Sequence, residues 1–176
     1  MDVKQDLRFI CEEITSLLRY AENKHSIFIA FNGIAIFGGM GLLRLLFAGE
    51  TEPGIKYIMC FTMIFLMLAI CTCMFSFFPQ ISEKFLKSEQ QAKTNILFFE
   101  HIKVHTVESY IEILCNEYST NFQDIGQFER CIIAQIIANA RLASRKFRLF
   151  KVAVIFDLLA VIAGLGGFLL MNIFLA

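Results

Sequence analysis

Two histidines, His101 and His105, lie four residues apart and form the first pattern with possible chemistry. On a helix this spacing places both imidazoles on one face, and imidazole is a common metal ligand. The pair lacks further ligands at metal-binding spacing, and Cys71-x-Cys73 has no histidine or second cysteine pair nearby. The sequence contains no glycine-rich phosphate loop, nucleophile elbow or H-E-x-x-H element. We therefore predict no metal site, no cofactor and no catalytic centre.

Basic residues gather just before the last apolar stretch, at Arg141, Arg145, Lys146, Arg148 and Lys151. One interpretation is attraction to anionic lipid of the inner leaflet, which would also set the topology. The other starts from Arg141 and Arg145, which share a helical face and have the geometry to grip a phosphate. Both interpretations stay open.

Asp157 lies within an apolar stretch, where a carboxylate costs about 2.5–3.5 kcal/mol at the helix centre on insertion scales. Either it reaches the interface or pairs with a basic residue there, such as Lys24, or it makes a polar contact between helices or subunits or lines a pore. Asn32 is the corresponding polar residue of another apolar stretch, and it is a second candidate for a polar contact in the membrane. Arg44 is expected to reach the outer interface with its long side chain.

The amino-acid composition indicates the environment in which these residues lie. Hydrophobic residues make up 57% of the 176 residues and charged residues only 18%, against roughly 45–50% and about 25% in soluble domains. Sixteen basic residues balance sixteen acidic ones, so nothing indicates a nucleic-acid partner. The length is typical of a single domain, residues 1–176, and the apolar excess predicts an integral membrane protein.

Three stretches are long and apolar enough to cross a bilayer, which takes about 20 residues. They are residues 27–47, 57–78 and 152–175. Glycines recur in the first and third of them, which allows close helix–helix approach within one subunit or between subunits. We slightly favour packing within one subunit.

Lysine and arginine counts predict the topology. Residues 1–24 carry four, residues 79–151 carry ten, and the chain end after the third stretch carries none. The N-terminus and residues 79–151 should therefore face the cytoplasm, with the C-terminus outward. An acidic N-terminus argues against a signal peptide.

The N-terminal part, residues 1–26, reads as an amphipathic helix with its apolar residues three and four positions apart. The stripe consists of Leu7, Ile10, Cys11, Ile14, Leu17, Leu18 and Ala21. We expect it to pack on the cytoplasmic segment, rather than lie on the leaflet, because its polar face is net acidic.

The cytoplasmic residues 79–151 are helical in pattern. We predict a short helix capped by Ser82 or Ser88, a longer helix over 95–118 and a loop over 119–126. From Gln127 one long helix, or two with a bend, should continue into the third stretch because no breaker intervenes. The fold class is all-α, with three transmembrane helices and a helical cytoplasmic region.

Several elements together resemble the bacterial Pycsar transmembrane effector family. They are Ala21-Glu-Asn-Lys24 before the first apolar stretch, Asn32-Gly33 within it, a phenylalanine-rich end of the second stretch with Pro79, Asn95-Ile-Leu-Phe-Phe99, and the run from Gln135 to Phe150. These elements follow the order of the family over nearly the whole chain.

The resemblance implies an antiphage effector of the bacterial inner membrane. A partner pyrimidine cyclase would make a cyclic pyrimidine mononucleotide, cUMP or cCMP, and the effector would then impair the membrane and stop growth. Membrane lipid and other copies of the chain are the further expected partners. We place the nucleotide phosphate near Arg141, Arg145 and Lys146, with Lys24 as a further candidate, because these residues join the cytoplasmic part to the apolar stretches.

Two other functions remain open. A constitutive small channel or holin-like toxin would act without a messenger, and a non-catalytic membrane scaffold would recruit a protein partner.

Overall fold

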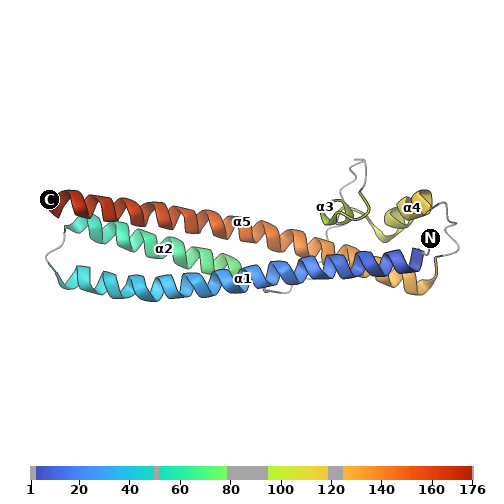
Figure 1. Cartoon of the computed structure of the whole chain (residues 1–176), viewed down its shortest axis with the longest axis horizontal. Coiled ribbons are helices and arrows are strands. Elements are labelled where there is room, and N and C mark those ends of the chain that lie inside the picture. The colour runs from blue at the N-terminus through green and yellow to red at the C-terminus, as the bar shows by residue number, and fades with distance from the viewer. Residues whose placement is uncertain (1–2, 50–51, 79–94, 119–124, 176) are drawn as a thin grey trace. The chain divides into compact units, whose positions relative to one another are not determined.

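The computed structural model describes residues 3–49, 52–78, 95–118 and 125–175, and helices account for 90% of these residues. The helices are α1 (Val3–Ala48), α2 (Pro53–Phe75), α3 (Phe99–Ile102), α4 (Val107–Tyr118) and α5 (Gln127–Leu175), shown in Figure 1. The described ranges contain no strand, so the all-α prediction is confirmed. The predicted short helix after Pro79 lies outside these ranges, as does most of the predicted loop over 119–126.

The chain forms two compact units, and α1 and α5 contribute to both. The first, which we call the core unit, comprises residues 1–22 and 79–147; the second, the span unit, comprises residues 23–78 and 148–176. Neither α1 nor α5 is interrupted where the chain passes from one unit to the other. The prediction that one helix continues from Gln127 into the last apolar stretch is therefore confirmed.

The core unit buries the apolar stripe of α1 against α3, α4 and α5. From α1 come Leu7, Ile10 and Ile14, which join Ile102 of α3, three residues of α4 and four of α5 in one cluster: Tyr110, Ile111, Leu114, Ile133, Ile136, Ile137 and Ala140. Each fully buried aliphatic side chain contributes about 1.5–3 kcal/mol relative to exposure. The expected packing of the stripe on the segment over residues 79–151 is confirmed for Leu7, Ile10 and Ile14, because these positions are almost completely buried.

Three polar contacts align α1 with α5 in this unit. Lys4 pairs with Glu129 at 3.1 Å, and Glu22 pairs with Lys146 at 3.1 Å. Between them, the Asn139 amide donates a hydrogen bond to the Thr15 hydroxyl at 3.4 Å. The residue numbers rise together along both helices, so this part of α1 and α5 runs parallel.

The predicted continuous helix over 95–118 is wrong, because the chain leaves helical conformation between α3 and α4. Thr106 caps α4: its hydroxyl accepts a hydrogen bond from the Ser109 backbone N–H at 3.2 Å. The side chain of Arg141 donates hydrogen bonds to the backbone carbonyls of Lys103 and His105. In a continuous helix these carbonyls would instead accept hydrogen bonds from backbone N–H groups of the same helix. The hydrogen bonds of Thr106 and Arg141 therefore stabilise a break in the helix that the helical periodicity of the sequence does not predict.

The start of that predicted helix is a turn instead. The Asn95 side-chain oxygen accepts a hydrogen bond from the Leu97 backbone N–H at 3.0 Å, which is the pattern of an Asx turn. The buried Tyr110 hydroxyl then donates to the Ile96 carbonyl at 2.7 Å. This turn is thus tied to the core of the unit through Tyr110.

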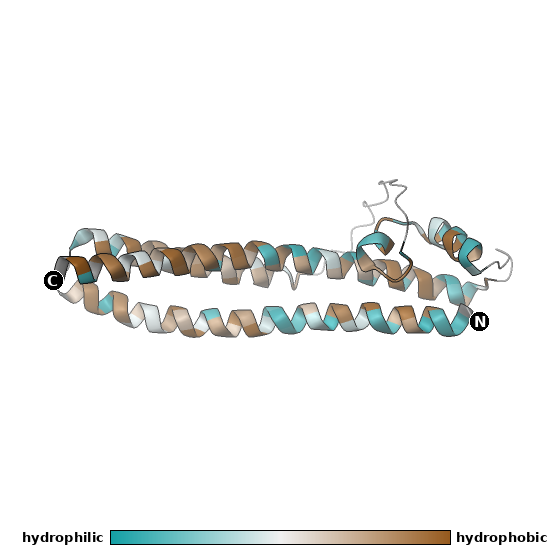
Figure 2. Ribbon diagram, turned by 45° about the horizontal axis from the view of Figure 1, so that its top comes forward, coloured by the Kyte–Doolittle hydropathy of each residue, from teal (hydrophilic) through white to brown (hydrophobic). Residues whose placement is uncertain are grey.

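The span unit contains the most apolar parts of α1, α2 and α5, coloured brown in Figure 2. In each helix an 18-residue window reaches a mean hydropathy of 1.9, 2.5 and 2.4 respectively, and no more than 22% of any window is buried within the protein. Apolar side chains that face outward in this proportion suit lipid rather than water. Three helices are therefore long and apolar enough to cross a membrane, as the sequence predicts.

Glycines allow close packing of α2 on both neighbours in this unit. A Cβ atom on Gly39 of α1 would overlap the Met63 terminal methyl, and one on Gly167 of α5 would lie 2.9 Å from Ile58. At Gly33, Gly38 and Gly41 nothing lies within 4 Å of such an atom. Packing within one subunit therefore uses Gly39 and Gly167, while three glycines of α1 stay open.

Truncation of Ile14 to alanine should destabilise the core unit by about 2–5 kcal/mol, because Ile14 is fully buried in the apolar cluster. The matched control is Phe9→Ala on the same helix, since Phe9 is 55% exposed and should lose little stability. Chemical unfolding in detergent measures both variants. Equal losses for the two would contradict this packing.

Candidate functional site

The candidate phosphate ligands on α5 lie in the core unit, and Arg141 already has protein partners there. Its Nε donates to the Lys103 carbonyl at 2.8 Å, and Nη2 donates to the His105 carbonyl at 2.9 Å. Charge-assisted hydrogen bonds of this kind are roughly twice as strong as neutral ones. Arg141 thus fixes the connection between α3 and α4 onto α5.

Lys103 is a second cation in the connection between α3 and α4, and the sequence analysis did not identify it. Its ammonium donates to the buried Ser144 hydroxyl at 2.8 Å and forms an ion pair with Glu100. Lys103 and Ser144 are separated by 41 positions in the sequence. No spacing pattern in the sequence could have brought these two side chains together.

The other two candidate phosphate ligands on α5 differ in how they are engaged. Lys146 is paired with Glu22, and only 12% of the Lys146 side chain is exposed. Arg145 is partly exposed and has no hydrogen bond or ion pair to any residue that the structure describes. Of the candidate phosphate ligands in the core unit, Arg145 is therefore the one whose guanidinium has no partner among the described residues.

Lys24, the fourth candidate, belongs to the span unit and lies among aromatic rings. Its ammonium is 5.7 Å from the centroid of the Phe150 ring, within reach of a cation–π contact. The neighbouring His25 is buried and packs edge-on against Phe150 at 5.3 Å and Phe77 at 6.0 Å between centroids. The structure thus places three candidates in the core unit and Lys24 in the span unit.

The two histidines do not share a helical face, because the chain leaves helical conformation between them. His101 Nδ1 accepts a hydrogen bond from the Asn95 backbone N–H at 3.1 Å, and His105 Nδ1 lies 3.1 Å from the Ser109 hydroxyl. The predicted spacing of one helical turn is therefore wrong. Among the residues described, no three His, Cys, Asp or Glu side chains gather at metal-binding distance.

Asn32 and Asp157, the two polar candidates of the apolar stretches, meet within the span unit. The Asn32 amide donates a hydrogen bond to the Phe28 carbonyl at 3.2 Å, and its side chain lies near that of Asp157. Asn32 is completely buried, whereas Asp157 remains partly exposed at the surface of the unit. The side chain near Asp157 is thus Asn32 of the neighbouring helix, which the sequence analysis did not name as its partner.

The Asn32 side chain is not fully satisfied by these contacts. Its Oδ1 atom is buried and has no hydrogen-bond partner among the residues that the structure describes. An unpaired buried acceptor costs about 1–3 kcal/mol. The Asn32–Asp157 contact joins α1 and α5, and the unpaired Oδ1 atom of Asn32 offsets part of the stability gained from it.

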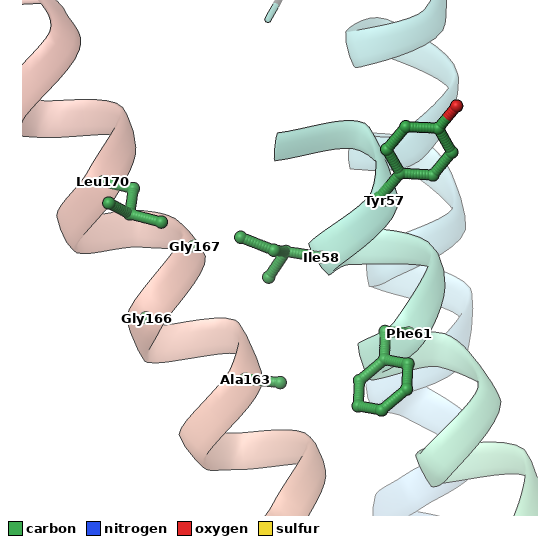
Figure 3. Close-up of a pocket in the computed structure, with 7 residues that line it drawn as sticks. All are labelled: Tyr57, Ile58, Phe61, Ala163, Gly166, Gly167 and Leu170. Atoms are coloured by element: carbon green, nitrogen blue, oxygen red, sulfur yellow. The ribbon is translucent and has the colours of Figure 1, made fainter. Parts of the chain in front are cut away.

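An apolar groove of about 430 Å³ lies between α2 and α5 in the same unit, as Figure 3 shows. Gly166 and Gly167 present no side chain to it, which leaves the groove open on the α5 side. Its lining is completed by Tyr57, Ile58, Phe61, Ala163 and Leu170. Such a lining offers apolar contact but no cation to hold a phosphate.

The stability of the core unit should fall on acidification because of His105. Burial lowers the pKa of this side chain below its ordinary value, and the neighbouring His101 lowers it further. The unfolded chain takes up the proton near pH 6.5, and the folded chain only at lower pH. Between these two values the unfolded state binds more protons, so folding is progressively disfavoured as the pH falls.

The measurement is the thermal unfolding midpoint in detergent at pH 7.5 and 5.5, for the wild type and for His105→Asn. Asparagine retains a group that can reach Ser109 but does not titrate. The wild type should lose more stability on acidification than the variant. An equal loss in both proteins would assign the acid sensitivity to other groups.

Comparison with known proteins identifies the family. The family model described as Pycsar effector protein domain matches residues 6–173, which cover most of both units. No curated protein and no solved structure matches the chain. The resemblance noted in the sequence is thereby confirmed, and the three apolar helices together with this family point to a membrane protein. The chain belongs to the Pycsar effector protein family.

Proposed function

We propose that this protein is an antiphage effector that impairs the bacterial inner membrane when it binds a cyclic pyrimidine mononucleotide. The ligand, cUMP or cCMP, would come from a partner pyrimidine cyclase that responds to infection. The observation that carries the proposal is the family match, because it extends over residues 6–173. The family supports the antiphage effector role, and the ligand, the cyclase and the membrane damage are the steps proposed here.

The division of the chain into two units supports a ligand-gated mechanism. The core unit offers polar and basic side chains, and the span unit offers apolar helices. Both α1 and α5 continue from one unit into the other without interruption. A ligand that binds one arrangement of the core unit more tightly would shift the population of the whole protein by that difference in affinity.

Arg145 is the first contact that we propose for the nucleotide phosphate. Its guanidinium has no partner among the described residues and can bind two phosphate oxygens at once. Arg141 and Lys146 lie on the same helix within four residues and remain proposed ligands, as does Lys24. For Lys146, binding would require exchange of its ion pair with Glu22.

The proposed topology follows from the lysine and arginine count. The N-terminus and the core unit would lie in the cytoplasm, where the cyclase product accumulates, and the C-terminus would face outward. We also propose that several copies assemble, because Gly33, Gly38 and Gly41 of α1 have no neighbour within 4 Å and could allow a helix of another copy to approach closely.

The direct test is leakage of a dye from liposomes that carry the purified protein, with cUMP, cCMP, cAMP or cGMP added separately. Leakage with a pyrimidine nucleotide and not with the purines is the expected result. Leakage without any nucleotide would instead support a constitutive channel or holin-like toxin. Tight liposomes under every condition would contradict membrane impairment and favour a scaffold.

Charge reversal at Arg145 should raise the nucleotide concentration needed for half-maximal leakage roughly tenfold or more, because a charge-assisted contact becomes a repulsive one. The matched control is Arg19→Glu, an exposed arginine of α1 in the same unit. The control should respond like the wild type. An unchanged response in Arg145→Glu would remove Arg145 from the proposed site.

A further inference from the structure

A group of charged and polar side chains lies where α3 packs on α5 in the core unit. Lys103 directly follows α3, and its ammonium donates a hydrogen bond to the Ser144 hydroxyl of α5 at 2.8 Å. The same ammonium forms an ion pair with Glu100, one turn earlier in the chain. The backbone carbonyl of Lys103 accepts the hydrogen bond from Arg141 Nε at 2.8 Å. Lys103 and Arg141 therefore bring two positive charges to one face of α5, since Arg141 and Ser144 are three positions apart.

Arg145 belongs to the same stretch of α5. The contacts of α3 with this helix extend from Ser144, which meets Lys103, to Phe147, whose ring lies 5.6 Å from that of Phe99 between centroids. Arg145 lies between these two contact positions and is four residues after Arg141, on nearly the same face. We call Lys103, Arg141 and Arg145 the cation group.

The positive charge of the cation group is only partly compensated. Arg141 donates to two backbone carbonyls, which carry no net charge, and no carboxylate of the described residues pairs with it. Arg145 has no partner among those residues. Of the carboxylates that the structure describes, Glu100 is the one that pairs with a member of the group. Like charges gathered on a partly buried surface repel one another, so a further anion is favoured there.

The Glu100 carboxylate occupies the more exposed side of the Lys103 ammonium. The side chain of Glu100 is 37% exposed and that of Lys103 is 23% exposed, whereas Ser144 is buried. Ser144 thus holds the ammonium from the protein side and leaves its opposite side toward solvent. An ion pair this exposed is weak, so an anion that also contacts Arg145 can replace the carboxylate.

A phosphate group has the chemistry that this arrangement favours. A phosphodiester carries one negative charge shared by two free oxygens. The ammonium of Lys103 can bind one oxygen as a point charge, and the planar guanidinium of Arg145 can bind both through its parallel N–H groups. A carboxylate on α3 that already pairs with Lys103 gains no such second contact, because Arg145 has no ion pair with it.

We propose that Lys103 is a second phosphate contact of the core unit, beside Arg145, and that Glu100 occupies this contact as an internal counterion until the ligand binds. Ser144 is a positioning residue, because it holds the ammonium in place. Binding would exchange the Glu100–Lys103 ion pair for a ligand contact and so change the interactions of α3. The identity of the ligand as a cyclic nucleotide rests on the proposed function, whereas the phosphate site rests on the contacts above.

The first test variant is Glu100→Gln, which removes the competing charge and keeps the shape of the side chain. Calorimetric titration of the purified full-length protein in detergent with cUMP and cCMP measures the affinity. Glu100→Gln should bind the preferred nucleotide roughly tenfold more tightly than the wild type, and Lys103→Gln roughly tenfold or more weakly. Lys103→Arg keeps the charge and should retain most of the affinity.

The matched control is Glu108→Gln. Glu108 is an exposed carboxylate of α4 in the same unit and has no ion pair with any described residue. This variant changes the net charge by the same amount and should bind like the wild type. A gain equal to that of Glu100→Gln would assign the effect to net charge and overturn the site. Misfolding does not produce a gain in affinity, and thermal unfolding without ligand checks that Lys103→Gln is folded.

Unchanged affinity in either Glu100→Gln or Lys103→Gln would overturn the site, while nucleotide binding by the wild type would still support the proposed function. Inorganic phosphate, compared with chloride at equal ionic strength, separates the two failures. A wild type that binds no cyclic nucleotide contradicts the proposed function. The phosphate site then stands if phosphate raises the thermal unfolding midpoint and raises it further in Glu100→Gln, and it falls if phosphate has no effect.

Discussion

A helix that crosses hydrocarbon must satisfy its own backbone, because no water is available for unpaired N–H and C=O groups. This constraint accounts for the uninterrupted course of α1 and α5 through the span unit, and for the placement of the irregular backbone at residues 103–106 in the core unit. There a side chain, Arg141, can supply the missing hydrogen bonds. The same constraint makes each polar side chain of the span unit informative. Asn32 donates a hydrogen bond to the Phe28 carbonyl of its own helix, and it lies near Asp157 of α5.

The two units use apolar residues in opposite ways. In the core unit Ile14 and Tyr110 are buried against other helices, and the exposed positions are largely polar. In the span unit large apolar side chains such as Phe37 and Ile64 face outward, and the inward positions include glycine, asparagine and threonine. One helix serves both environments because its residues change character along its length. This division is what a membrane effector with a cytoplasmic ligand site would require.

Sequence patterns predicted the features that depend on composition and period. The apolar stretches, the stripe around Ile14 and the continuous helix from Gln127 all follow from counting residues along the chain. The break before α4 did not, because Arg141, which takes the freed carbonyls, lies 36 and 38 residues away. For the candidate site, Asn32 and Asp157 were recognised singly by their cost in lipid, but periodicity on two separate helices gives no register between them. Tertiary contacts also distinguish the two arginines: Arg141 donates to two backbone carbonyls, whereas Arg145 has no partner among the described residues.

The central claim is that a nucleotide bound by the core unit changes the helices of the span unit. Hydrogen–deuterium exchange of the liposome-reconstituted protein, with and without cUMP or cCMP, tests it most directly. The account predicts slower exchange with ligand around Arg145 and, in the same samples, faster exchange around Asn32 and Asp157. Ligand-dependent protection confined to the core unit, with unchanged exchange around Asn32 and Asp157, would contradict it.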